Sequence, residues 1–139
     1  MQVLWKICNR MNEYITEDLT LSGPNHVTIK FKKLEELNKE LNKEPTNNVY
    51  TIQQVGTDLF LSCTDGELHW SPTASDSSKW ETLGAVRGPL IIMAYKKDLP
   101  FGEARMLGVE EGRLVVKTKE YAASWYLHPT HYPRQYLYG

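Results

Sequence analysis

One short sequence pattern occurs twice in this chain. Residues 60–71 read FLSCTDGELHWS and residues 106–117 read MLGVEEGRLVVK. The matched pairs are Leu61 and Leu107, Gly66 and Gly112, Leu68 and Leu114, each 46 residues apart, and then Trp80 and Trp125, 45 apart. A period of 20 to 50 residues indicates one supersecondary unit that buries its apolar face only by joining its copies. This repeat limits the possible folds more than any other feature of the chain.

Three such periods nearly fill the 139 residues, so a first copy is expected near the N-terminus. Residues 4–22, LWKICNRMNEYITEDLTLS, match residues 49–71 in their apolar positions but lack the glycine of the turn. The copies are expected at about 1–45, 46–87 and 88–139. A chain of this length buries one sizeable core, so we expect a single domain.

Each copy is expected to hold about four short strands. Asp65-Gly66 and Glu111-Gly112 predict two hairpin turns, because glycine adopts a positive φ without steric cost. Residues 26–31, HVTIKF, alternate apolar and polar side chains and predict a closing strand. Twelve strands in three pseudo-symmetric repeats of roughly 46 residues predict an all-β fold, the β-trefoil. The main alternative is a two-sheet sandwich, which needs no threefold period.

One stretch departs from the β pattern. Residues 32–44 read KKLEELNKELNKE and place Leu34, Leu37 and Leu41 on one side of a helix that Pro45 ends. We expect a short surface helix at about 33–43, between the first two copies. Its leucines would cover the barrel wall or dock a partner.

The composition excludes several functions. Sixteen basic and 17 acidic residues give a net charge of −1, so no basic field favours nucleic acid. No segment reaches the roughly 20 apolar residues of a membrane span, and the first ten residues do not form a secretory leader. Cys8 and Cys63 fit neither a disulfide scaffold nor a zinc pattern, which favours two reduced thiols over a bridge.

No motif predicts catalysis. The chain contains no GxSxG, HExxH, Walker or GxGxxG pattern, and its hairpin carboxylates occupy turns for structural reasons. His128 and His131 lie three residues apart with a proline between them, and no third metal ligand is evident. We expect neither an enzyme nor a metal or other cofactor.

Two segments outside the repeat are candidates for partner contact. The long loop at 96–105 surrounds one phenylalanine with charges, and the tail is rich in tyrosine and arginine, which are enriched at binding hot spots. A solvated loop and plain barrel closure are the alternative interpretations. The candidate partner-binding residues are Lys96, Lys97, Asp98, Phe101, Glu103, Arg105, Tyr132, Arg134 and Tyr136.

The repeats also resemble known trefoil families. Residues 4–25, with Gly23-Pro24 after the second strand, resemble the opening hairpin of the interleukin-1 superfamily of cytokines. Residues 91–117 resemble that superfamily's central segment, especially in its interleukin-18 and interleukin-33 type members. Residues 49–71 are more weakly similar to the second repeat of fibroblast growth factors, but the basic cluster that binds heparan sulfate is missing.

The resemblance implies a monomeric, cytokine-like ligand of an immunoglobulin-domain receptor. Such a ligand would be secreted without a signal peptide, and a cytoplasmic protein is the other expected location. The alternatives are a trefoil lectin, a protease inhibitor that presents loop 96–105, and a fascin-like intracellular trefoil that binds proteins. The Gln-x-Trp signature of lectin trefoils is absent, because the tryptophans stand in SKW and ASW.

Overall fold

The described part of the chain consists mainly of antiparallel strands. The computed structural model describes residues 4–21, 26–34, 47–84, 88–95, 105–118 and 122–131. Within these ranges there are ten strands and one 3-10 turn, η1. They are β1 (Leu4–Cys8), β2 (Ile29–Lys33), β3 (Asn47–Gln54), β4 (Phe60–Thr64), β5 (Glu67–Ser71), η1 (Asp76–Ser78), β6 (Lys79–Gly84), β7 (Leu90–Ala94), β8 (Met106–Glu110), β9 (Arg113–Lys117) and β10 (Tyr126–His131).

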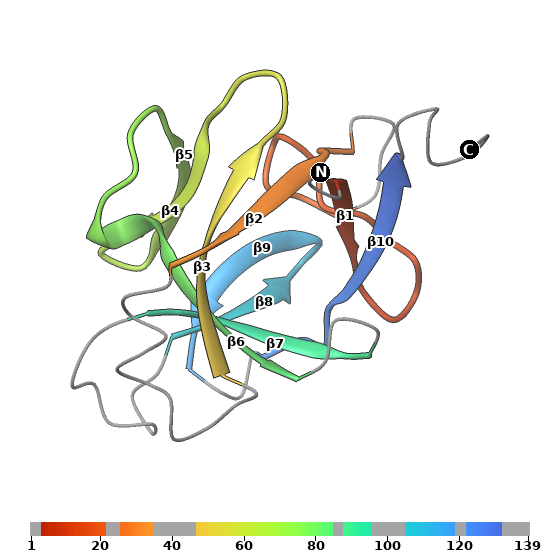
Figure 1. Cartoon of the computed structure of the whole chain (residues 1–139). Coiled ribbons are helices and arrows are strands. Elements are labelled where there is room, and N and C mark those ends of the chain that lie inside the picture. Colours follow the sequence, from red (N-terminus) through yellow and green to blue (C-terminus); the bar gives the residue numbers. More distant parts are fainter. Residues whose placement is uncertain are drawn as a thin grey trace.

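The ten strands belong to one antiparallel sheet. The strand order is β10-β1-β2-β3-β6-β7-β8-β9, and β4 and β5 branch from β3. Pairing of β1 with β10 joins the two ends of the described chain (Figure 1). The β4–β5 hairpin lies on the opposite side of the molecule in that view.

The repeat predicted from the sequence reappears in two hairpins. Strand β4 pairs with β5 from Phe60 opposite Ser71 down to Thr64 opposite Glu67. Strand β8 pairs with β9 in the same register 46 residues later. The turn residues have φ of 52° and 82° at Asp65 and Gly66, and of 52° and 77° at Glu111 and Gly112. Positive φ at both central residues is what a two-residue hairpin of this kind requires.

The first copy does not form the corresponding hairpin. Residues 14–16, 20 and 21 make isolated bridges, among them Ile15 with Leu21 and Thr20 with Arg113 of β9. Leu19 has φ of 59°, at the position that Asp65 and Glu111 occupy in the other copies. A leucine in this conformation costs free energy that aspartate or glycine largely avoids.

The predicted β-trefoil of about twelve strands with a surface helix is therefore wrong. The described residues form a single ten-stranded antiparallel sheet, and their one helical element is the turn η1. Part of the predicted strand count is lost because the first copy has no glycine turn and forms bridges instead. The helix is expected to begin at Lys33, but Lys33 is the last residue of β2. Leu34 belongs to neither a helix nor a strand. The rest of the expected helix lies in residues 35–46, outside the described ranges.

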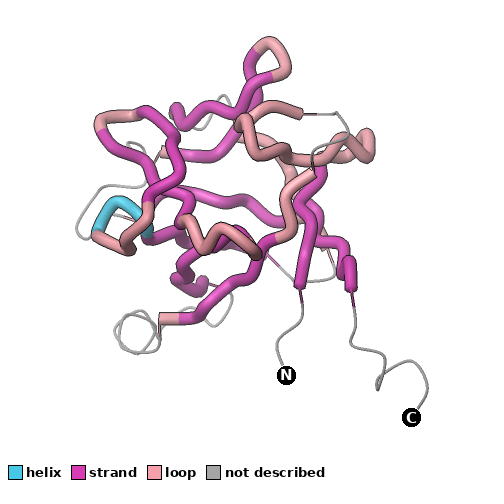
Figure 2. The backbone as a smooth tube through the Cα atoms, turned by 90° about the horizontal axis from the view of Figure 1, so that it is seen from above, coloured by secondary structure: helices cyan, strands magenta, loops and turns pink. Residues whose placement is uncertain are grey.

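The core lies between the strands and includes the repeated tryptophans. Trp80 and Trp125 are fully buried. They belong to one cluster of buried apolar side chains, which also includes Ile7 and Val116. Each indole N–H donates to a backbone carbonyl, Trp80 to Leu61 at 2.9 Å and Trp125 to Leu107 at 3.0 Å. The prediction that these two tryptophans belong to the core is confirmed. Figure 2 shows the strands throughout the described chain and η1 in cyan.

Both cysteines are free thiols, as the spacing favoured. Cys8 is buried and Cys63 is half-buried. Burial raises the pKa of the Cys8 thiol above its ordinary value of 9.0. Among the described residues no helix has the length and apolar character to cross a membrane.

Candidate functional site

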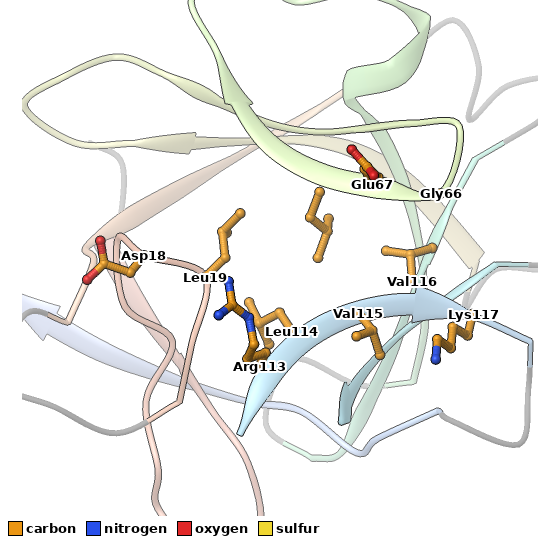
Figure 3. A pocket seen from close by; sticks show the side chains of 10 residues that line it. Asp18, Leu19, Gly66, Glu67, Arg113, Leu114, Val115, Val116 and Lys117 are labelled. Atoms are coloured by element: carbon orange, nitrogen blue, oxygen red, sulfur yellow. The ribbon is translucent and has the colours of Figure 1, made fainter. Parts of the chain in front are cut away.

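A hollow of about 320 Å³ opens where three turns meet (Figure 3). One wall comes from the bridge-forming stretch of the first copy, one from the start of β5 and one from β9. We call it the three-turn hollow. Its lining residues are Asp18, Leu19, Gly66, Glu67, Leu68, Arg113, Leu114, Val115, Val116 and Lys117.

The hairpin turns position two walls of the three-turn hollow. Gly66 and Gly112 close hairpins of equal register, so the first residues of β5 and β9 leave their turns in equivalent ways. The third wall is held by local bonds instead: Leu19 N–H donates to Thr16 O at 3.0 Å, and the hydroxyls of Thr16 and Thr20 lie 2.7 Å apart. Hydroxyl bonds of this local kind are an alternative to a strand ladder.

The floor of the three-turn hollow is apolar and continuous with the core. Leu114 and Val116 are buried members of the core cluster, and Leu19 and Leu68 are half-buried against it. Side chains packed in this way have few free rotamers. The floor is therefore a rigid surface that an apolar group could cover.

The rim of the three-turn hollow carries charges of both signs. Lys117 forms an ion pair with Glu110. Asp18, Glu67 and Arg113 are exposed, and none of them forms an ion pair with another described residue. Figure 3 shows the Arg113 guanidinium next to the Leu19 side chain, with Asp18 beyond it and Glu67 on the β5 side. An unpaired guanidinium beside apolar side chains favours a carboxylate or another planar anion.

The first turn of the first copy and that of the second copy are a second exposed feature. Asn12 and Asp58 have φ of 61° and 60° and lie 46 residues apart, one in each of two such turns. The exposed large hydrophobic side chains among the described residues are Met11, 78% exposed, and Val55, 40% exposed, and both lie in these turns. The Asn9 carboxamide oxygen accepts from Met11 N at 3.0 Å, which fixes the first turn.

The structure describes one of the predicted partner-binding residues, Arg105. It is exposed immediately before β8, and its backbone oxygen accepts from Ala94 N at 2.8 Å. By the 46-residue offset of the sequence repeat, positions 55 and 58 correspond to positions 101 and 104. The remaining candidates lie outside the described residues: Lys96, Lys97, Asp98, Phe101, Glu103, Tyr132, Arg134 and Tyr136.

Sequence reasoning did not find the three-turn hollow. The repeat pattern assigns Gly66, Glu67 and residues 113–117 to hairpins, and the structure has them there. Their convergence depends on contacts between segments about 50 to 100 residues apart, such as the bond from Leu114 N to Leu19 O. The equal spacing of the three turns in the repeat was the available signal. No group of three or more metal-ligating side chains occurs within the described ranges.

Comparisons with known proteins give a likeness of fold alone. No family model matches the chain, and no curated protein matches it. Among solved structures, it is similar to the GH43 β-1,3-galactosidase BT0265, with a TM-score of 0.66 and 14% sequence identity. The match covers 89% of this chain and 26% of that one, so this chain spans about a quarter of the galactosidase's length.

That neighbour is an enzyme, but a likeness at 14% identity carries only the fold to this chain. The expectation that the chain is not an enzyme remains a prediction. The resemblance to interleukin-1 superfamily cytokines likewise remains a prediction, since the galactosidase does not bear on it.

Proposed function

We propose that this chain is a non-enzymatic binding module that recognises a partner protein. The observation that carries the proposal is the three-turn hollow, which combines an apolar floor with unpaired charges on its rim. Its volume suits one large side chain of a partner, and anchors of this kind supply most of the binding energy at protein interfaces.

The rigid support of the hollow favours binding over a purely structural role. Two of its walls are hairpins with fixed turns, and its floor belongs to the core. A preformed site loses little conformational entropy when a partner binds. The exposed Met11, held on a fixed turn, offers a second apolar contact of the same preformed kind.

Selection from a displayed library of random peptides and protein fragments tests this function. The wild-type chain is compared with a Glu67→Lys, Arg113→Glu double variant, which reverses the rim charges while the net charge and floor stay the same. We expect wild type to enrich a family of related sequences that the variant does not enrich. Enrichment of no sequences by either chain would contradict a protein-binding function.

The finer form of the proposal is a cytokine-like ligand of an immunoglobulin-domain receptor, as the resemblance implies. Loop 96–105 and the tail residues Tyr132, Arg134 and Tyr136 would supply contacts, together with the turn that presents Met11. Binding to a panel of purified receptor ectodomains, measured by surface plasmon resonance, tests this form. If no receptor in the panel binds the chain, the cytokine proposal is contradicted. The display experiment then remains the test of the wider protein-binding proposal.

Carbohydrate binding is the second candidate, favoured by the likeness to part of a galactosidase. Titration with galactose and with β-1,3-linked galactobiose, followed by calorimetry, tests it. The same disaccharide, incubated with the chain and assayed for released galactose, tests the non-enzymatic prediction. We expect no release; hydrolysis above a heat-denatured control would overturn that prediction.

A further inference from the structure

A second group of titratable side chains lies apart from the three-turn hollow, where β1 pairs with β10 (Figure 1). In that ladder Lys6 of β1 lies opposite His128 of β10. Cross-strand partners share one face of a sheet. Ile7, the next residue of β1, is buried in the core cluster, and successive side chains of a strand alternate between faces. Lys6 and His128 therefore share the outer face.

The Tyr14 ring joins this pair to a second histidine. It stacks on the His26 imidazole, with ring centroids 4.7 Å apart and an interplanar angle of 27°. The His128 imidazole meets the same ring in a T-shaped arrangement, at 5.9 Å and 70°. The Lys6 ammonium lies 3.5 Å from the His26 carbonyl oxygen. We call these four residues, Lys6, Tyr14, His26 and His128, the histidine–tyrosine cluster.

The polar groups of the histidine–tyrosine cluster are open to a ligand. His128 is exposed, and the other three residues are half-buried. In the described part of the chain, neither imidazole forms a hydrogen bond, and the Tyr14 hydroxyl forms none either. Lys6 has three ammonium N–H donors, and its single contact, at 3.5 Å, is long for a hydrogen bond. The cluster thus offers several donors that the described residues leave unused.

No carboxylate neutralises the cluster within the described ranges. Neither of the two ion pairs found there includes a member of the cluster. The nearest described carboxylates in the sequence are Glu13, which accepts from the Asn9 amide at 2.9 Å, and Glu17, which is exposed. By strand alternation the other titratable side chains on this outer face are Cys8, Lys30 and Tyr126. The face is therefore favourable for an anion.

The positive charge of the cluster grows as the pH falls. Histidine side chains gain their charge between about pH 8 and pH 5, whereas lysine is charged throughout this range. Three cations around one tyrosine ring repel one another, and a bound anion would offset that repulsion. A phosphomonoester carries up to two negative charges and three acceptor oxygens, which match this donor set better than a single carboxylate does.

We propose that the histidine–tyrosine cluster binds a phosphomonoester group. The Lys6 ammonium and the two imidazolium rings donate to its oxygens, and the Tyr14 hydroxyl supplies a further donor. This site goes beyond the proposed protein-binding function and is separate from the three-turn hollow, because no residue that lines the hollow belongs to the cluster.

The probes are acetyl-phosphoserine-amide, glycerol 2-phosphate and sulfate, each titrated into the isotope-labelled chain and followed by NMR. We expect saturable shifts of the His26 and His128 ring signals at millimolar phosphate ester. Affinity for the esters should be greatest near about pH 6, because the second proton of the phosphate dissociates there while the histidines lose their charge above it.

Sulfate keeps both negative charges throughout, so its affinity should continue to rise as the pH falls to about 5. The two phosphate esters identify the source of the group. Tighter binding of the capped phosphoserine would indicate a phosphorylated partner protein, and equal affinity would indicate a small phosphate ester.

Three variants assign the binding to the cluster. His128→Gln, at an exposed position, should weaken ester binding about fivefold at pH 6 and have little effect at pH 8. Lys6→Gln should weaken it about fivefold at both pH values, since lysine keeps its charge. His69→Gln is the matched control, because His69 is an exposed histidine of β5 outside the cluster, and it should bind as wild type does.

Several outcomes would overturn the inference. One is the absence of saturable shifts at millimolar ester, and another is equal ester affinity at pH 6 and pH 8. A third is the same shifts with sodium chloride at matched ionic strength, which would mean general screening. A fourth is wild-type binding by both His128→Gln and Lys6→Gln. Each would remove this site and leave the display test of the three-turn hollow unaffected.

Discussion

The β8–β9 hairpin and the stretch from Tyr14 to Leu21 occupy equivalent places in the repeat, yet only the first forms a strand ladder. The hairpin turns on Glu111-Gly112, whereas the first copy has Leu19 in the left-handed region and uses the Thr16 and Thr20 hydroxyls instead. The difference indicates that the turn glycine decides whether this repeat unit forms a regular strand ladder. The first copy, which lacks the ladder, forms one wall of the three-turn hollow through Asp18 and Leu19.

The tryptophans provide the most severe test of the equivalence between the second and third copies. Trp80→Ala and Trp125→Ala should each lower the free energy of unfolding by about 3–5 kcal/mol, since each removes a fully buried indole. The two losses should agree within about 1 kcal/mol because both indoles bond a carbonyl at the same repeat position. Urea denaturation measures both. A Trp125 variant near wild-type stability would break the comparison.

The turn glycines test the cause of the difference between the copies. Gly66→Ala and Gly112→Ala should each cost about 1–2 kcal/mol, because both positions have positive φ while an added Cβ meets no atom within 4 Å. The loss is thus one of backbone conformation alone. Asparagine, which tolerates this conformation better, should recover part of it. Equal stability of the alanine and asparagine variants in thermal denaturation would contradict this explanation.

A pair of buried hydroxyls distinguishes the second copy from the third. Ser62 Oγ and Ser78 Oγ lie 2.8 Å apart in the second copy, where the third has Gly108 and Ala123. Ser78→Ala should cost about 1–2 kcal/mol, because it removes the Ser62 hydroxyl's buried partner. The Ser62→Ala, Ser78→Ala double variant should lose less than the sum of the single losses. Additive losses in the denaturation cycle would show that the hydroxyls do not act as a pair.

The smallest expected effect concerns Cys8, which belongs to the first copy. Burial raises the pKa of its thiol, so the folded chain holds this proton more tightly than the unfolded chain does. The contribution of the Cys8 proton to the free energy of unfolding is fully present below the ordinary pKa of 9.0. This contribution is lost as the pH rises through the folded-state pKa. Unfolding measured between pH 8 and 10 should show this decline, and Cys8→Ala should reduce it. An unchanged slope in the variant would assign the decline to other groups.

Local sequence patterns predicted the features that depend on local chemistry. Asp65-Gly66 and Glu111-Gly112 located both hairpins, and the spacing of Trp80 and Trp125 identified core positions. The strand count failed in the first copy, because no local pattern reveals that Leu19 adopts a left-handed conformation. That conformation accompanies long-range bonds to β9.

The three-turn hollow could not be predicted from the sequence for a related reason. Arg113 follows a hairpin turn, and in the sequence it looks like any solvated strand residue. Its neighbour Leu19 lies 94 positions earlier, and only the bridge between Thr20 and Arg113 brings the two segments together. Site residues contributed by one local segment can be inferred from a pattern, whereas this site exists only once distant turns converge.

The turn fixed by Asn9 has a chemical consequence for the protein in solution. Of the three methionines in the described ranges, Met93 and Met106 are buried while Met11 is 78% exposed. Peroxide should therefore convert Met11 to its sulfoxide first, and the change from apolar to polar would occur on the surface without disturbing the packed interior. If Met11 contacts a partner, its oxidation would weaken partner binding before spectroscopy detects any unfolding.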